Sequence, residues 1–181
     1  RPLLSGLAAA PGVAAGRVRI LRDAADGADL EPGEVLVAPM TSPDWVPTMR
    51  RAAALVTDGG GVTCHAAIVS RELRLPCIVG TRQGTRILRD GELVTVDGAA
   101  GTVYEGDVTA LLATAPAAGV RVGSAAGPVP SAPQALGTRV YVNLAMPEAA
   151  EAAAGLPVDG VGLLRAEFML TEALGGEHPR R

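Results

Sequence analysis

The sequence contains no lysine and very few aromatic residues. All 16 basic residues are arginine, and aromatic residues make up only 2% of the 181 residues. Since 48% of the residues are hydrophobic, a core is possible, but it must be built from alanine, valine and leucine. The formal net charge is −3 and no basic tract interleaved with aromatic residues occurs, which argues against nucleic-acid binding.

Cysteine and histidine are also scarce. The two cysteines are Cys64 and Cys77, and the two histidines are His65 and His178. Two cysteines do not make a disulfide framework, and this scattered set argues against a zinc tetrad. No apolar run approaches the length of a membrane span, and no signal peptide is visible. We therefore expect a reduced, cytoplasmic protein that has no metal site and no contact with a membrane.

The stretch Leu55–Gly80 organises the chain, because it predicts a strand, a glycine turn, a helix and a second strand in succession. Thr63 precedes an apolar run with helical spacing and is predicted to cap the helix. Pro76 ends that helix, since the residue before a proline is pushed out of the α region. The other predicted segments are a strand over Ala52–Thr57, a turn over Asp58–Gly61 and a strand over Cys77–Val79.

His65 falls in the first turn of the predicted helix, where backbone N–H groups lack helical partners and the helix dipole favours anions. A glycine loop that leads into a helix start is a common way to hold a phosphate. A neutral imidazole, with a reference pKa of about 6.5, is also a usable nucleophile near pH 7. The glycines match neither the dinucleotide fingerprint nor the Walker pattern. From spacing alone, a simple tight turn with a polar His65 near a cap remains an alternative.

The residues from Gly60 to Gly80 resemble the phosphohistidine signature of the PEP-utilising enzymes. The signature reads Gly-Gly-Val-Thr-Cys-His-Ala-Ala-Ile-Val-Ser-Arg-Glu-Leu, followed by Leu-Pro-Cys-Ile-Val-Gly. Within that family, the Thr-Cys-His form most resembles the phosphoenolpyruvate synthases (pyruvate, water dikinases). The pyruvate phosphate dikinases and enzyme I usually have Thr-Ser-His. Val62 departs from the arginine usual in the synthases, although the dikinases tolerate an apolar residue there.

The resemblance implies a role for each residue of this motif. His65 would carry the phosphoryl group as a phosphohistidine intermediate, with Gly60 and Gly61 in the supporting loop. Thr63 would support the site and would also be phosphorylated by a regulatory kinase/phosphorylase, which would repel an incoming phosphate. Cys64 flanks His65, and a packing or positioning role suits it better than nucleophilic catalysis.

The segments around the motif predict an α/β domain. Trp45 is interpreted first as a core anchor, and by resemblance its segment sits beside the phosphorylatable histidine. Asp97-Gly98 marks a hairpin loop. The predicted elements are strands over Arg17–Leu21 and Glu34–Ala38, an acidic loop over Asp23–Gly33, a helix from Thr41 to about Arg51, and hairpin strands over Glu92–Val96 and Thr102–Tyr104. For residues 1–113 the resemblance implies the swivelling β/β/α phosphohistidine domain.

Residues 114–137 are rich in alanine, proline and glycine and predict a linker between domains. Beyond it, a strand over Arg139–Ala145, a helix over Pro147–Ala154 and a strand over Gly160–Leu164 predict a parallel strand pair. By resemblance, residues 138–181 are the truncated start of the PEP-binding (β/α)8 barrel. Arg165 would bind the phosphate of PEP, although a charge after a strand is otherwise a common surface feature. We interpret His178 as structural.

The resemblance implies the reaction pyruvate + ATP + water → PEP + AMP + phosphate, with phosphoryl transfer through His65. ATP and Mg²⁺ would act in the full-length enzyme, and we expect neither bound to this segment. The implied partners are an ATP-grasp domain, the complete barrel, pyruvate or PEP, and the regulatory enzyme acting on Thr63. We expect the segment alone to be inactive. A pyruvate phosphate dikinase, an enzyme I-like phosphotransferase and a non-catalytic swivelling binding module remain alternatives.

Overall fold

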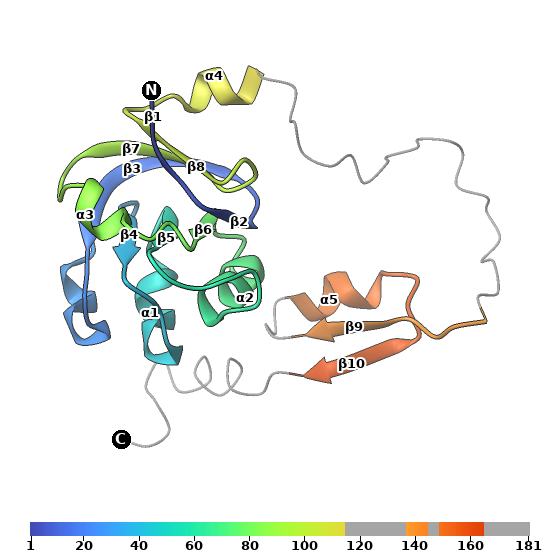
Figure 1. Cartoon of the computed structure of the whole chain (residues 1–181). Helices are drawn as coiled ribbons and strands as arrows, with labels where there is room; N and C mark the ends of the chain where they lie inside the picture. Colours follow the sequence, from blue (N-terminus) through green and yellow to red (C-terminus); the bar gives the residue numbers. More distant parts are fainter. Residues whose placement is uncertain (115–136, 145–148, 165–181) are drawn as a thin grey trace. The chain divides into compact units, whose positions relative to one another are not determined.

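The computed structural model describes residues 1–114, 137–144 and 149–164. The chain divides into two units, Arg1–Val120 and Arg121–Arg181, which are described separately (Figure 1). The predicted linker over 114–137 lies almost entirely outside the described residues.

The first unit is built on an eight-stranded mixed sheet with the order β1-β8-β7-β3-β4-β5-β6-β2. The neighbours β3, β4, β5 and β6 pair in parallel, and the pairs β1–β8, β7–β8, β3–β7 and β2–β6 are antiparallel. The strands are β1 (Pro2–Ser5), β2 (Leu7–Ala10), β3 (Val13–Ile20), β4 (Val35–Ala38), β5 (Ala54–Thr57), β6 (Cys77–Val79), β7 (Leu93–Asp97) and β8 (Thr102–Glu105).

Short helices connect the strands of this sheet (Figure 1). The longest is α2, which leads from β5 to β6 and packs against β2 and β6. The helical segments are η1 (Ala24–Asp29), η2 (Pro43–Trp45), α1 (Val46–Met49), α2 (His65–Glu72), α3 (Gly84–Ile87) and α4 (Thr109–Thr114).

The core consists of small aliphatic side chains, as the composition predicts. Five strands of the sheet, β3, β4, β5, β7 and β8, contribute completely buried valines, and Ile78 and Leu88 add the larger side chains of this cluster. Trp45 is only 4% exposed, which confirms its interpretation as a core anchor. Burying side chains of this kind stabilises the fold by roughly 1.5–3 kcal/mol each. The fully buried valines of the cluster are Val18, Val35, Val37, Val56, Val94, Val96 and Val103.

The hairpin is confirmed, since β7 and β8 pair antiparallel with Val96 opposite Val103. The Asp97 carboxylate accepts hydrogen bonds from the N–H groups of Ala99 and Ala100, which explains an aspartate at the turn. The predicted acidic loop is largely the 3-10 helix η1, where the Asp23 side chain accepts from Ala25 N–H at its start.

The predicted helix from Thr41 to about Arg51 is a 3-10 turn, η2, followed by the single α-turn α1. Strands β1 and β2 have no counterpart in the predicted segments. Both are four-residue strands at the two edges of the sheet, where pairing with distant β8 and β6 rather than local alternation fixes them. Pro11 and Gly12 separate β2 from β3, and Gly12 has φ +130°, a conformation that favours glycine.

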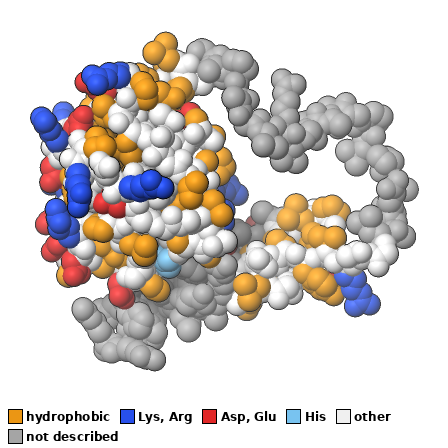
Figure 2. Space-filling model, in the orientation of Figure 1, with side chains coloured by type: hydrophobic (Ala, Val, Ile, Leu, Met, Phe, Trp, Pro, Cys, Tyr) orange, Lys and Arg blue, Asp and Glu red, His pale blue; other side chains and the backbone are white. Residues whose placement is uncertain are grey.

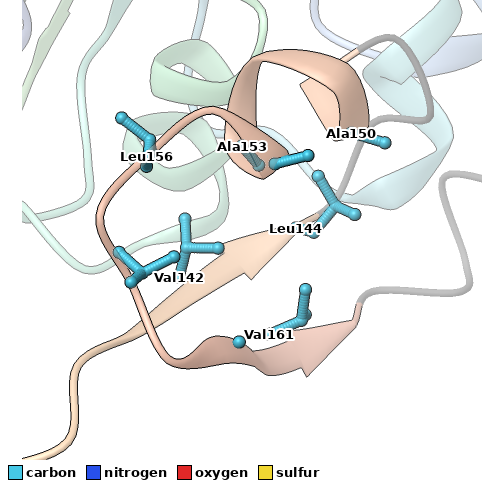
Figure 3. A pocket seen from close by; sticks show the side chains of 9 residues that line it. Val142, Leu144, Ala150, Ala153, Leu156 and Val161 are labelled. Carbon is cyan, nitrogen blue, oxygen red and sulfur yellow. The ribbon is translucent and has the colours of Figure 1, made fainter.

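The second unit contains a strand, a helix and a strand. β9 (Tyr141–Leu144) and β10 (Gly160–Leu164) pair in parallel, which confirms the predicted parallel pair, and α5 (Ala149–Ala154) connects them. Aliphatic side chains of the strands and of α5 line an open apolar hollow (Figure 3). Leu156 at its rim is 50% exposed, so the apolar surface of this unit is only partly covered by the described residues.

Candidate active site

The candidate site lies at the carboxyl ends of three parallel strands. Thr41 follows β4, Asp58 opens the glycine loop after β5, and Gly80 follows β6. Because the strands are parallel, their carboxyl ends lie on the same side of the sheet, so these residues come close together. Open α/β sheets bind ligands beyond the carboxyl ends of their strands. The segments are also joined directly: Arg82 N–H donates to Asp58 O (2.8 Å) and Gly80 N–H donates to Gly59 O (3.2 Å).

The glycine loop is tightly packed at Gly60. Gly60 has φ +98°, and a Cβ built there would lie 2.8 Å from Cys64 Sγ. A residue with a side chain would therefore be strained and would press on the cysteine that precedes His65. At Gly61 a Cβ would meet nothing within 4 Å, so packing does not require a glycine there. Of the two supporting glycines predicted from sequence, only Gly60 is under steric constraint.

Helix α2 begins at His65, and its N-cap is Cys64 rather than Thr63. The predicted Thr63 cap is therefore wrong. Cys64 N–H donates to Gly61 O (3.0 Å), a turn that leaves Cys64 as the last extended residue (φ −73°, ψ 167°) before the helix. Thr63 is one position too early to cap and is exposed, and no side chain makes a capping hydrogen bond.

The start of α2 presents unpaired donors. Cys64 O accepts from Ile68 N–H (3.0 Å), which is the first bond of the helical ladder. Within the described residues, no acceptor is found for the N–H groups of Thr63, His65, Ala66 and Ala67. Four free N–H groups at the positive end of a helix make this a favourable place for an anionic group.

The His65 imidazole is half-buried and contacts Thr41, which opens the segment of Trp45 that the resemblance places beside the histidine. Thr41 itself was not among the predicted site residues. Thr41 Oγ1 lies 3.1 Å from His65 Nδ1. Thr41 is 6% exposed, so this contact is sheltered from water. A histidine side chain, coloured pale blue, is visible on the face of the molecule that Figure 2 shows. No described residue makes a hydrogen bond to His65 Nε2, and burial lowers the pKa of the ring below 6.5.

The two cysteines differ in environment. Cys77 is buried in β6, and burial raises the pKa of its thiol to about 12, so it remains protonated near neutral pH. Cys64 is half-buried against Gly60. The proximity of Cys64 to Gly60 is a matter of packing, which is one of the two roles expected for Cys64 from the sequence.

Asp58 connects the glycine loop to the next loop. Its carboxylate accepts hydrogen bonds from the backbone N–H (2.9 Å) and the hydroxyl of Thr85, at the start of α3. Gly84 lies under this contact, because a Cβ there would be 3.1 Å from Asp58 Oδ1. Asp58 thus holds the loop after β6 against the loop after β5.

Among the described residues, no group of His, Cys, Asp or Glu side chains could hold a metal ion. The described helices include none long and apolar enough to cross a membrane. Arg165 and His178 lie outside the described residues, so the structure does not locate either of them.

Two family descriptions match the chain. Residues 30–101 match the mobile domain of PEP-utilising enzymes, and residues 130–179 match the PEP-binding domain of PEP-utilising enzymes. The matches correspond to the two blocks of residues that carry the resemblance in the sequence.

Curated relatives are similar over nearly the whole chain. A phosphoenolpyruvate synthase of Pyrococcus furiosus is 51% identical over 98% of this chain and 21% of its own length. A probable phosphoenolpyruvate synthase of Methanothermobacter thermautotrophicus is 48% identical over 99% of this chain and 25% of its own length. Among solved structures, an Enzyme I solution structure shows 33% identity and a TM-score of 0.42 over 49% of this chain and 36% of that chain. The chain thus spans about a fifth to a quarter of the length of these curated relatives.

Proposed function

Because this chain belongs to the PEP-utilising enzyme family, we propose that its first unit is the phosphohistidine-carrying mobile domain of a phosphoenolpyruvate synthase. His65 is the residue that accepts and passes on the phosphoryl group. The observation that carries this proposal is the position of His65: it is the first residue of α2, beside four free N–H groups, with Thr41 on Nδ1.

The contact with Thr41 suits a nucleophilic Nε2. If Nδ1 carries the ring proton and donates it to Thr41 Oγ1, the lone pair of the neutral imidazole is on Nε2. Burial lowers the pKa of His65, which keeps the ring neutral at pH 7. Attack by a neutral Nε2 requires no separate base, because the proton stays on Nδ1 throughout.

The proposed cycle is the one that the resemblance to the phosphoenolpyruvate synthases implies. Nε2 attacks the β-phosphorus of ATP. The bond from this phosphorus to the oxygen that bridges the α- and β-phosphates breaks, and AMP leaves with the electron pair. Water then hydrolyses the terminal phosphate from the pyrophosphorylated His65. Finally, an oxygen of the pyruvate enolate attacks the remaining phosphorus, the N–P bond breaks, and PEP forms. Positioning and charge stabilisation dominate such transfers, and the helix start can supply the latter.

The remaining parts of the cycle are assigned to other segments of the full-length enzyme. We propose that an ATP-grasp domain of the full-length enzyme holds ATP and the Mg²⁺ bound with it, as the resemblance to the synthases implies. The second unit is proposed as the first strands and helix of the PEP-binding barrel. Its half-covered apolar surface would then be buried by the later strands and helices, and Arg165 would contact the phosphate of PEP.

Thr63 is proposed as a regulatory site. It is exposed and lies beside the free N–H groups, so a regulatory kinase/phosphorylase could reach its hydroxyl. A phosphate there would occupy the positive helix start and repel the phosphoryl group that His65 must accept. Gly60 and Cys64 are proposed to support the site by packing, since a Cβ at Gly60 would lie 2.8 Å from Cys64 Sγ.

A labelling experiment tests the assignment of His65. The chain incubated with ATP and Mg²⁺ alone should gain no phosphate, whereas addition of the ATP-grasp domain should label His65 from the β-phosphate. Transfer between separate molecules should be slow, because the effective concentration of a linked domain is lost. The label should be acid-labile, base-stable and absent from His65→Ala.

The same experiment distinguishes the alternatives. Retention of the γ-phosphate alone as the stable label, or labelling of His65→Ala, would contradict the proposed cycle. A domain of the enzyme I type would be labelled from PEP and would pass the phosphate to a small carrier protein. A non-catalytic binding module would not be labelled at all.

A further inference from the structure

Arg71 links the glycine loop to the edge of the sheet. It lies in the last turn of α2, and its Nε donates to Ala9 O of β2 at 2.7 Å. Its Nη2 donates to the backbone oxygen of Val62, in the loop that precedes His65. One guanidinium therefore contacts two backbone carbonyls that are far apart in the sequence, and neither contact is part of the regular pairing of helix or sheet.

The contact with Val62 bears directly on where α2 begins. In an α-helix each N–H donates to the carbonyl four residues earlier, so Val62 O is the partner that Ala66 N–H would have if the helix were longer. That bond is not made, and Val62 O accepts from Arg71 instead. Because the C=O and N–H of one trans peptide point in opposite directions, the N–H of Thr63 faces away from Arg71. It too has no acceptor among the described residues.

We propose that Arg71 is a positioning residue that keeps the start of α2 open for a phosphoryl group. It holds Val62 O away from the helical ladder, so that the N–H groups of Thr63 and Ala66 remain available to an anion on His65. Arg71 does not contact the reacting atoms and acts through the loop. The inference rests on the proposed function of His65, since open donors matter only if a phosphoryl group arrives there.

The competing explanation is a purely electrostatic effect of a cation at the carboxyl end of a helix. Arg74 provides the matched control, because it lies three positions later, is exposed, and makes no side-chain hydrogen bond found among the described residues. Arg74→Met removes the same charge from the same end of α2 without affecting Val62. Arg71→Lys keeps the charge but lacks the planar fork, so one ammonium group must replace two donors that point to different carbonyls.

The test uses the whole chain and potassium phosphoramidate, a small phosphoryl donor that needs no protein partner. Phosphorus NMR follows both the formation of phosphohistidine and its hydrolysis after the donor is removed. We expect Arg71→Met and Arg71→Lys to lose the phosphoryl group roughly tenfold faster than the wild type, because hydrogen bonds to a charged group are lost. Arg74→Met should match the wild type.

Amide NMR supplies a measurement that a general loss of stability would not reproduce. On phosphorylation of the wild type, the amide signals of Thr63 and Ala66 should shift strongly. In Arg71→Met, the Ala66 amide should instead be protected from hydrogen exchange before phosphorylation, since it would pair with Val62 O. Thermal unfolding of all variants identifies any that fail to fold. If Arg71→Met does not fold, Arg71→Lys alone is compared with the wild type.

The outcomes separate this inference from the proposed function. If the wild type is phosphorylated on His65 and both Arg71 variants behave like it, the role of Arg71 is overturned and that of His65 stands. If all three variants, including Arg74→Met, lose phosphate equally fast, the effect is one of charge and the positioning role is overturned. If the wild type forms no phosphohistidine at His65, neither proposal survives.

Discussion

Thr41 Oγ1 lies 3.1 Å from Nδ1 of His65, which joins the carboxyl end of β4 to the first residue of α2. This contact holds the imidazole ring through Nδ1, and no described residue makes a hydrogen bond to Nε2. It is sheltered, since Thr41 is 6% exposed, and it comes from a segment that does not belong to the phosphohistidine signature.

Replacing Thr41 by valine should slow the phosphorylation of His65. Valine has a similar shape but accepts no hydrogen bond from Nδ1–H, so the tautomer with a free Nε2 is no longer favoured. We expect a roughly tenfold lower rate in the assay with the ATP-grasp domain, and little change for Thr41→Ser. Equal rates for the valine and serine variants would show that the contact with Thr41 does not direct the ring.

The pH dependence of phosphorylation should reflect the lowered pKa of His65. Burial disfavours the charged ring, so the neutral nucleophile persists at pH values below its ordinary pKa of about 6.5. The rate should therefore hold through that pH and fall only at lower pH. Titration of the His65 ring signals by NMR, with His178 as the internal comparison, measures this directly.

The lowered pKa of His65 should also make the free energy of unfolding depend on pH, with lower stability at lower pH. Between the lowered pKa of folded His65 and about 6.5, the unfolded chain binds more protons than the folded chain. The contribution of His65 to the free energy of unfolding is thus present above that window and is lost as the pH falls through it. Urea unfolding across the window should show this loss, and His65→Gln should remove it.

A negative charge at position 63 should affect the phosphorylation of His65 far more than a change from threonine to serine. Because Thr63 is exposed and does not cap α2, Thr63→Ser should leave the free energy of unfolding within about 0.5 kcal/mol of the wild type. Thr63→Glu should phosphorylate at least roughly tenfold more slowly than Thr63→Ser, since its carboxylate repels the incoming phosphate. Equal rates in a full-length enzyme would remove the regulatory proposal.

The two glycines before the signature threonine should respond differently to alanine. Gly60→Ala should destabilise the first unit by about 1–3 kcal/mol, because its φ is +98° and the new Cβ would press on Cys64 Sγ. Gly61→Ala should cost little, since its Cβ would meet nothing within 4 Å. Thermal unfolding compares the two, and a similar loss of stability in both would contradict the packing at Gly60.

The sequence by itself determined the elements whose signals are local. The glycine turn, the helix that begins near His65, the strand after Pro76 and the Asp97-Gly98 hairpin were all predicted, because a few neighbouring residues set their backbone angles. The phosphohistidine signature lies within this continuous stretch, which is why His65 could be identified without a structure. The parallel pair of the second unit was predicted because a strand, a helix and a strand in succession favour a parallel connection.

Only the tertiary structure decided which distant groups complete the site. Thr41 meets His65 across 24 residues and Arg71 meets Ala9 across 62, and no local pattern encodes such contacts. The edge strands β1 and β2 likewise exist through pairing with β8 and β6. The N-cap lies on Cys64 rather than on Thr63, although propensity favours a threonine cap, because the backbone of the folded loop makes Cys64 the last extended residue (φ −73°, ψ 167°) before α2.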